Sequence, residues 1–227
     1  LVGHPLLELA KPNLGKEEFL ERIQANNDHI IIGLLPGSRE QEIKRILPVM
    51  LKSCQELNSK FKHLKVVIGL APTIKKEIIS SHLDSFSEIQ VLENLTYEVM
   101  KYSDLLLVAS GTATVESALI ETPMLVIYKT NFLTYFLAKL LVKVPYISMV
   151  NLIAQKKVVP EFIQSKAKPK LIVQEMKSFL KDQNKYQQTK KSLAQIKIRL
   201  NEGNTKENLV EHPYLKAAKI VNQILTG

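Results

Sequence analysis

Residues 105–128 read LLLVASGTATVESALIETPMLVIY, and this stretch decides the fold that we predict. Two short apolar runs, 105–109 and 124–128, flank a segment whose apolar residues have helical spacing. Uninterrupted apolar runs of this length are typical of strands that are buried on both faces of a parallel sheet. The pattern therefore predicts a strand, a tight polar turn at 110–112, a helix from Ala113 and a second strand.

The polar turn after the first strand is a candidate phosphate site. Gly111 lets a ligand approach the backbone closely, and the amides of Thr112 to Thr114 lie at the positive end of the predicted helix. Glu116, about one helical turn further on, is placed to accept hydrogen bonds from paired hydroxyl groups such as those of a ribose. Ordinary helix capping also fits Ser110 and both threonines. The turn is neither a Walker A loop nor a GxGxxG motif.

A second polar turn, Pro36-Gly37-Ser38-Arg39, also lies between an apolar run and a predicted helix. In one parallel sheet the two turns open on the same edge, which is where ligands of α/β sheets bind. Arg39 then offers a forked, permanent positive charge to a phosphate held by the first turn. Alone, this turn fits a helix start with a solvent-facing arginine, but two such turns on one edge favour a phosphate-bearing ligand.

The rest of the chain alternates strands and helices, which predicts an α/β fold with a parallel sheet and helices on both faces. We expect a linker at 1–15, a sheet domain at 16–165 and, at 166–227, a helical segment that packs on or beyond the sheet. The expected strands are 29–35, 64–70, 89–92, 105–109 and 124–128. The expected helices are 16–25, 40–58, 73–82, 95–102, one from Ala113, 170–181, 184–201 and 207–225.

The composition favours an anionic small-molecule partner. The chain of 227 residues has 31 Lys and Arg against 22 Asp and Glu, a net charge of +9, which suits partners such as nucleotide diphosphates. The positive charges form no run of five or more, so nucleic-acid binding is disfavoured. No apolar run is long enough for a membrane span. The apolar segment 132–144 is too short to span a bilayer, and its pattern favours packing in the core over lying on a membrane face.

Neither cysteine nor histidine chemistry is indicated. Cys54 is the only cysteine, which excludes an internal disulfide and a cysteine-based metal site, and we expect it in the core. The five histidines lie far apart in the sequence, and none pairs with another at helical spacing. We therefore predict no metal site and no cofactor.

Several stretches share their residues, order and spacing with a known family. They are Val2–Leu6, Leu34–Arg39, Ala109–Thr114, Thr122–Met124, Leu133–Ser148 and Asn151–Ala154. On these residues the chain closely resembles the C-terminal part of bacterial lipid-A-disaccharide synthases. The resemblance covers most of 1–165, whereas the last sixty or so residues match only in helical character.

The resemblance implies a GT-B fold, in which two Rossmann-like domains face each other across a cleft. Residues 16–165 would be the UDP-sugar-binding, Rossmann-like domain, from a fragment or from one half of a split enzyme. The family transfers 2,3-diacylglucosamine from UDP to 2,3-diacylglucosamine 1-phosphate and releases UDP. The acceptor surface and the general base are expected on an N-terminal domain, so this chain alone should be inactive. The implied location is cytoplasmic, peripheral on the inner face of the bacterial inner membrane. The resemblance leaves open whether the protein is a homodimer.

The resemblance also assigns roles to individual residues. Arg39 would meet the UDP diphosphate and help to neutralise the leaving group, Glu116 would bind ribose hydroxyls, and Asn151 would lie near the donor. The residues assigned to donor binding are Ser38, Arg39, Ser110, Gly111, Thr112, Thr114, Glu116 and Asn151. Such a site needs no metal, because an arginine and helix amides can stabilise the diphosphate.

Departures from the family pattern leave the role of one loop open. Val150, Gln155 and Lys156 stand where the family usually has proline, glycine and arginine, and Lys129 stands where arginine is common. Two other functions stay open as well. One is another GT-B enzyme, such as a UDP-N-acetylglucosamine 2-epimerase-like enzyme or a muramyl-lipid transferase; the other is a non-catalytic UDP-sugar-binding subunit.

Overall fold

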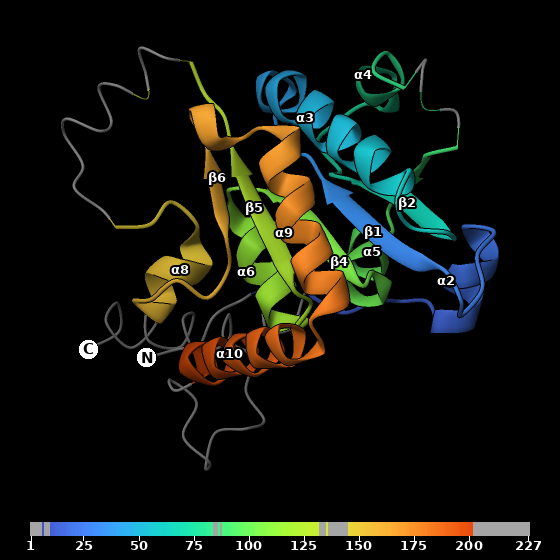
Figure 1. Cartoon of the computed structure of the whole chain (residues 1–227). Coiled ribbons are helices and arrows are strands. Elements are labelled where there is room, and N and C mark those ends of the chain that lie inside the picture. Colours follow the sequence, from blue (N-terminus) through green and yellow to red (C-terminus); the bar gives the residue numbers. More distant parts are fainter. Residues whose placement is uncertain are drawn as a thin grey trace, which may run out of the picture.

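The computed structural model describes residues 6, 10–83, 86, 88–131, 135 and 145–201. In this part of the chain, six parallel strands form one sheet in the order β3-β2-β1-β4-β5-β6 (Figure 1). The strands are β1 (Ile30–Leu35), β2 (Leu64–Leu70), β3 (Gln90–Glu93), β4 (Leu105–Ala109), β5 (Met124–Tyr128) and β6 (Glu161–Ile163). The helices are α2 (Lys16–Arg22), α3 (Glu40–Asn58), α4 (Lys76–Ser80), α5 (Thr96–Tyr102), α6 (Thr112–Leu119), α8 (Met149–Ala154), the 3-10 helix η1 (Gln164–Lys166), α9 (Pro169–Lys181) and α10 (Gln183–Asn201).

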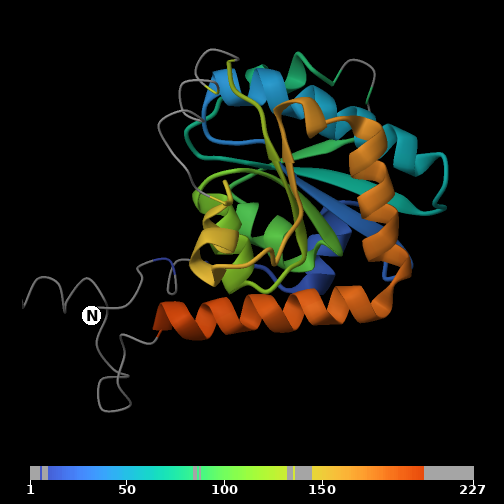
Figure 2. The same ribbon diagram turned by 60° about the vertical axis from the view of Figure 1, so that its left-hand side comes forward.

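Helices cover both faces of the sheet, as predicted. Strand side chains alternate between the faces: Leu105 and Leu107 of β4 join one core, whereas Leu106 and Val108 join the other. The first core contains side chains of α3, α4 and α9, and the second contains side chains of α2, α5, α6, α8 and α10. Figure 2 shows the sheet between these two layers.

The two central strands send their helices to opposite faces. β1 pairs with β4, with Leu35 opposite Val108 at the carboxyl ends. α3 follows β1 and packs in the first core, whereas α6 follows β4 and packs in the second. Because the chain leaves neighbouring strands in opposite directions, a crevice forms between the two turns, and such a switch point is where open α/β sheets bind ligands.

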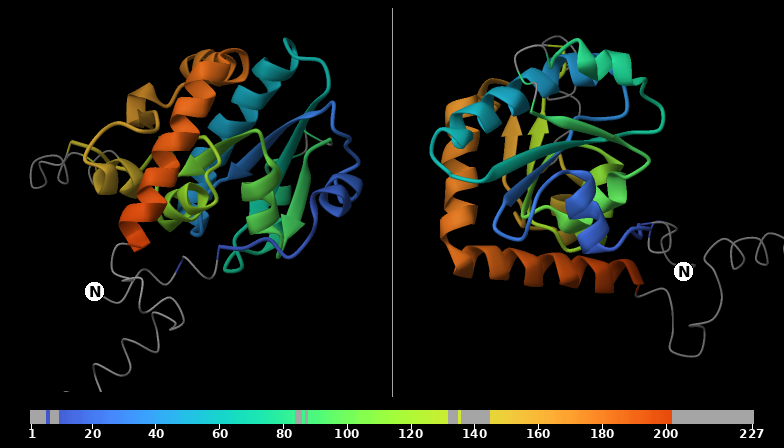
Figure 3. Two further views of the ribbon diagram at one scale, coloured as in Figure 1. Left: turned by 90° about the horizontal axis from the view of Figure 1, so that it is seen from below. Right: turned by 90° about the vertical axis from the view of Figure 1, so that its right-hand side faces the viewer.

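The helices α9 and α10 belong to the same packed unit as the sheet. α9 lies against α3, and its Met176 and Phe179 are buried in the first core. α10 turns away from α9 and runs along the edge of the molecule (Figure 3), where its Leu193 and Ile196 join the second core. Within the described part of the predicted segment 166–227, α9 therefore contacts α3 and the sheet, whereas α10 packs against the helices α6, α8 and α9. The predicted helix at 207–225 lies outside the described residues, as does most of 132–144.

Three elements were not predicted from the sequence: β6, α8 and the short 3-10 helix η1. β6 has only three residues, all partly exposed, at the edge of the sheet, so it is too short for a period-two pattern. α8 has six residues, and its start is set by Ser148, whose side chain accepts a hydrogen bond from the Asn151 amide. Helix α4 is also shorter than the predicted 73–82, because a turn at Pro72 and Thr73 precedes it and Lys75 is still extended.

Candidate functional site

Both polar turns line one cavity of about 450 Å³ at the carboxyl edge of the sheet. Gly37 and Ser38 contribute from the turn after β1, and Ser110, Gly111 and Thr112 contribute from the turn after β4. The remaining lining comes mainly from the end of β2 and from α5. The spatial relationship that the sequence predicted between the two turns is thus present in the structure. A cavity of this size is within the range of small-molecule sites.

The conformation of the turn after β1 depends on Gly37 and on a hydrogen bond from the segment after β2. Gly37 has φ of +117°, a conformation that side chains other than glycine rarely adopt, and a Cβ there would overlap the Glu42 carboxylate. The Thr73 hydroxyl donates a hydrogen bond to the Ser38 carbonyl at 3.0 Å. Arg39 follows at the start of α3 and is exposed; it adjoins the cavity without being one of its lining residues.

A carboxylate occupies part of this turn. The Ser38 amide donates to Glu42 Oε2 at 3.3 Å, and Glu42 lines the cavity. Partial burial raises the pKa of Glu42, while the Ser38 hydrogen bond and the Arg39 charge act in the opposite direction. Glu42 therefore takes a backbone amide that a bound anion could otherwise use.

The turn after β4 leaves backbone donors facing open space. Gly111 is extended, and a Cβ added to it would meet no atom within 4 Å, so packing within the described residues does not require glycine here. Among the described residues, no acceptor bonds the amides of Thr112 and Ala113, the first two residues of α6. Unpaired amides at a helix start carry partial positive charge and favour an anion.

Ser110 and Thr114 differ in this turn. The Ser110 hydroxyl donates to the Ile147 carbonyl at 3.2 Å, which joins the turn to the segment before α8, and Ser110 lines the cavity. Thr114 is buried, and its hydroxyl donates to the Gly111 carbonyl at 2.7 Å. The Thr114 hydroxyl thus shapes the turn, and its contact with the donor stays a prediction.

Glu116 lines the cavity at the end nearest α5. Its Oε1 accepts a hydrogen bond from the Tyr97 hydroxyl at 2.9 Å, and Tyr97 lines the same cavity. Tyr97 was not predicted from the sequence, because it lies on a different helix and its spacing from Glu116 matches no helical or strand period. Asn13, which also lines the cavity, was likewise missed, since it falls in the predicted linker.

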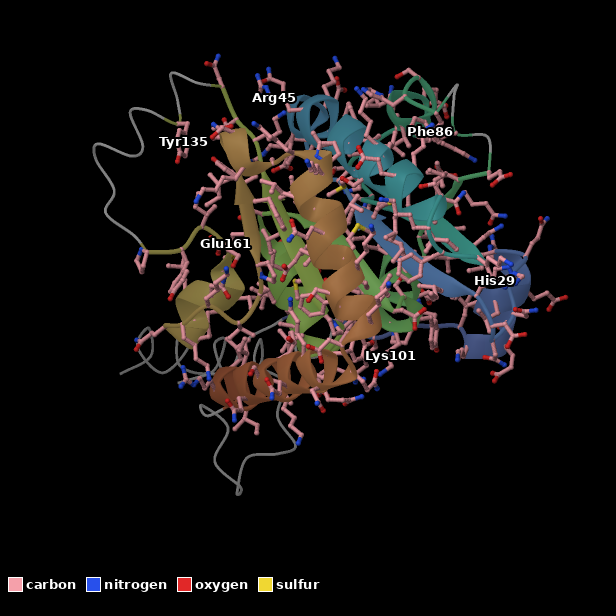
Figure 4. The ribbon with its side chains drawn as sticks, viewed as in Figure 1. His29, Arg45, Phe86, Lys101, Tyr135 and Glu161 are labelled. Atoms are coloured by element: carbon pink, nitrogen blue, oxygen red, sulfur yellow. The ribbon has the colours of Figure 1, made fainter. Side chains whose placement is uncertain are left out.

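Asn151 is hydrogen-bonded within the chain, and its position near the donor stays a prediction. Its amide group donates to the Val159 carbonyl and to Glu161, both at 2.8 Å. Its side-chain oxygen accepts from the amides of Val158 and Val159, at 2.8 and 3.0 Å. The side chain is fully buried, and these four bonds use its usual hydrogen-bonding capacity. It fixes the path of the chain from α8 to β6 (Figure 4, where Glu161 is labelled).

The structure shows the surroundings of two of the departures around α8. Val150 is buried in the second core. Gln155 ends α8 in the left-handed conformation, with φ of 53°, where glycine is the favoured residue.

Within the described residues, no cluster of three or more His, Cys, Asp or Glu could hold a metal ion, and none of the helices there combines the length and apolarity that a bilayer span requires.

A parallel Rossmann-like sheet, with a cavity at its switch point and helix amides that no described residue bonds, defines the class: a Rossmann-like α/β domain with a candidate ligand site at the carboxyl edge of its sheet. The family model of lipid-A-disaccharide synthetase matches residues 1–213. The chain belongs to the lipid-A-disaccharide synthetase family.

Curated relatives agree with this family. The lipid-A-disaccharide synthase of Persephonella marina is 38% identical over 206 residues, which cover 88% of this chain and 54% of the relative. The enzyme of Nitrosococcus oceani is 36% identical over 203 residues, or 89% of this chain and 52% of the relative. The chain thus spans about half the length of the curated relatives that it matches.

Solved structures share the fold at low sequence identity. A glycosyltransferase from Rickettsia africae has a TM-score of 0.60 at 11% identity, over 97% of this chain and 54% of that one. The Staphylococcus aureus protein MnaA, solved with UDP, has a TM-score of 0.56 at 16% identity, over 85% of this chain and 48% of that one. These similarities confirm the predicted Rossmann-like α/β fold, the architecture of one half of a GT-B glycosyltransferase.

Proposed function

We propose that this chain is the donor-binding part of a lipid-A-disaccharide synthase. The complete enzyme would transfer 2,3-diacylglucosamine from its UDP donor to 2,3-diacylglucosamine 1-phosphate and release UDP. The observation that carries the proposal is the single cavity lined by both turns, in a chain of this family. The likeness to UDP-N-acetylglucosamine 2-epimerases is weaker, because it is one of fold alone, at 16% identity or below.

The diphosphate would lie between the two turns. On one side it would accept hydrogen bonds from the free amides of Thr112 and Ala113, with Gly111 permitting close approach and Ser110 adjoining. On the other side Ser38 and the exposed guanidinium of Arg39 would face it. Arg39 adjoins the cavity, so a modest movement of its flexible side chain would bring the forked charge onto a phosphate.

Catalysis by this part of the enzyme would be electrostatic. When the bond between the anomeric carbon and the β-phosphate oxygen breaks, negative charge develops on the departing UDP. Arg39 and the helix amides would stabilise that charge, so the site needs no metal. The acceptor hydroxyl would lose its proton to a general base that we expect in the part of the family that this chain does not span.

The lipid acceptor, the membrane surface and the location belong to the same proposal. An enzyme that joins two acylated sugars must meet its substrates where lipids gather, and we propose the inner face of the bacterial inner membrane. We also propose that the chain alone binds UDP without forming disaccharide. Assaying it with both lipid substrates tests this, and substantial turnover by the purified chain would contradict it.

Titration with uridine, UMP and UDP tests the proposed site. We expect UDP to bind most tightly, and we expect Arg39→Ala to weaken UDP by about 10- to 100-fold with little effect on uridine, because charge-assisted hydrogen bonds contribute about 1.5–3 kcal/mol. Arg45→Ala is the matched control, since Arg45 carries the same charge but lies within α3 (Figure 4), more than one helical turn beyond the cavity-lining turn that Arg39 directly follows. Equal weakening by both variants, or no uridine-nucleotide binding at all, would contradict the proposal.

A further inference from the structure

The hydroxyl of Tyr97 lies 2.9 Å from Oε1 of Glu116, and both residues line the cavity. Tyr97 lies in α5 and Glu116 in α6, so the bond joins two helices that follow different strands. Both side chains are only partly buried. The contact therefore lies on the wall of the site and not inside the core.

The bond restricts the carboxylate before a ligand arrives. A glutamate side chain has several rotatable bonds, and holding it in one conformation normally costs free energy at the moment of binding. The Tyr97 hydroxyl carries one donor proton and engages one carboxylate oxygen, whereas a carboxylate has about four acceptor positions. Acceptor capacity for a ligand therefore remains after Tyr97 has bonded.

The neighbours of Tyr97 in α5 are each held by hydrogen bonds that do not involve Glu116. The Thr96 hydroxyl donates to the Leu70 carbonyl at 3.0 Å and holds the start of α5 against the end of β2. Glu98, the residue after Tyr97, is buried and accepts hydrogen bonds from the amides of Asn13 and Leu14, at 2.6 and 3.1 Å. Tyr97 therefore extends from a helix that is anchored on both sides, and its hydroxyl can act as a fixed reference for Glu116.

We propose that Tyr97 is a positioning residue that orients Glu116 to select nucleotides with ribose hydroxyls. The inference rests on the proposed function, in which Glu116 accepts hydrogen bonds from those hydroxyls. Tyr97 acts through Glu116 and sets the strength of discrimination between UDP and an analogue that lacks the hydroxyls. Its own contribution to the binding of such an analogue is small.

The test compares UDP with 2′,3′-dideoxyuridine diphosphate by calorimetric titration of the full chain. We expect the wild-type chain to prefer UDP by about tenfold or more. Tyr97→Phe removes only the hydroxyl, and we expect it to reduce this preference by about 2- to 10-fold while the affinity for the dideoxy analogue stays within about twofold. General damage to the fold would weaken both ligands alike.

Tyr102→Phe is the matched control. Tyr102 lies on the same helix and loses the same atom, but its hydroxyl donates to the Leu14 carbonyl at 2.7 Å, so the UDP preference should not change. A second control is Tyr97→Phe in a Glu116→Ala background, where the substitution should no longer alter the preference.

The outcomes separate this inference from the proposed function. A wild-type chain that binds UDP and its dideoxy analogue equally would contradict the role proposed for Glu116, and the inference with it. A wild-type preference that persists unchanged in Tyr97→Phe would overturn the inference alone. Loss of affinity for both ligands in Tyr97→Phe would show a merely structural role and would overturn it too.

Discussion

Glu42 Oε2 lies 3.3 Å from the backbone nitrogen of Ser38, inside the cavity that both turns line. The carboxylate thus sits where the proposed donor brings its diphosphate. Like charges repel more strongly in a partly buried site than in water. The negative charge of Glu42 therefore disfavours binding of the diphosphate. Arg39, which lowers the pKa of Glu42 through its charge, would then be drawn between carboxylate and phosphate.

Glu42→Gln should strengthen UDP binding. The substitution removes one negative charge and keeps the side-chain volume, so we expect a gain of about 1 kcal/mol, or roughly fivefold in affinity. The effect should be smaller for UMP and absent for uridine, because it depends on phosphate charge. Titration of the three ligands measures it, and an unchanged or weaker affinity for UDP would contradict the role given to Glu42.

The same residue predicts a pH dependence. The pKa of Glu42 is raised from its ordinary value of 4.5 by burial, and a nearby diphosphate raises it further, so UDP binding takes up a proton. UDP affinity of the wild-type chain should therefore approach that of Glu42→Gln as the pH falls toward 5, and the gap should widen toward pH 8. UDP's own titration is common to both proteins and cancels. A gap that is constant with pH would contradict this linkage.

The free energy of unfolding should also depend on pH through the titration of Glu42. A carboxyl whose pKa is higher in the folded protein contributes most to stability below its unfolded pKa, and this contribution is lost as the pH rises through the folded value. Urea unfolding of the two proteins at several pH values provides an independent check. Glu42→Gln should gain relative stability as the pH rises.

Glu161 should be essential for the stability of the segment before α8. Its carboxylate accepts hydrogen bonds from the amides of Ile147 and Ser148, both at 3.0 Å, and from the side chains of Ser148 and Asn151, at 2.7 and 2.8 Å. Glu161→Ala would leave these donors unpaired, which we expect to cost about 2–4 kcal/mol of unfolding free energy.

Urea unfolding measures that cost, and hydrogen exchange at the two amides locates it. Glu175→Ala is the control, because Glu175 pairs with Lys185 in a partly exposed ion pair at 2.6 Å, a kind of pair that contributes at most about 1 kcal/mol. Equal effects of the two substitutions would show that the Glu161 network does not stabilise the fold.

Gln155→Gly should stabilise the chain. Gln155 ends α8 with φ of 53°, and relief of this left-handed conformation is expected to contribute about 1 kcal/mol, partly offset by the greater flexibility of glycine in the unfolded chain. Gln174→Gly, within α9 and exposed, should instead destabilise by about 1 kcal/mol. A loss of stability in Gln155→Gly would contradict the strain assigned to this position.

The sequence was sufficient for strands β1 to β5 and for the meeting of the two turns, but not for β6, for physical reasons that particular residues show. The apolar runs of β1, β4 and β5 are continuous because both faces of these strands are buried. Such continuous runs identify the strands in the sequence. Parallel strands place their carboxyl-end turns on one edge, which is why Ser38 and Gly111 could be paired in advance.

Contacts between side chains of different elements could not be read in the same way. Tyr97 and Glu116 meet only because α5 and α6, which follow different strands, pack on the same face of the sheet. Asn151 occupies a position that the family resemblance marks as functional. Its side-chain amide nevertheless forms hydrogen bonds with the backbone that leads to β6. Polarity in a sequence pattern does not reveal whether a side chain bonds a ligand or its own backbone.

The central claim is that both turns grip one diphosphate, and amide chemical shifts measured by NMR during UDP titration test it most directly. We predict that the resonances of Ser38, Thr112 and Ala113 shift together with one dissociation constant, and that uridine shifts them much less. Residues at the opposite edge of the sheet, such as Lys62 and Gln90, serve as the reference and should stay in place. Shifts confined to one turn, or centred on that opposite edge, would contradict the account.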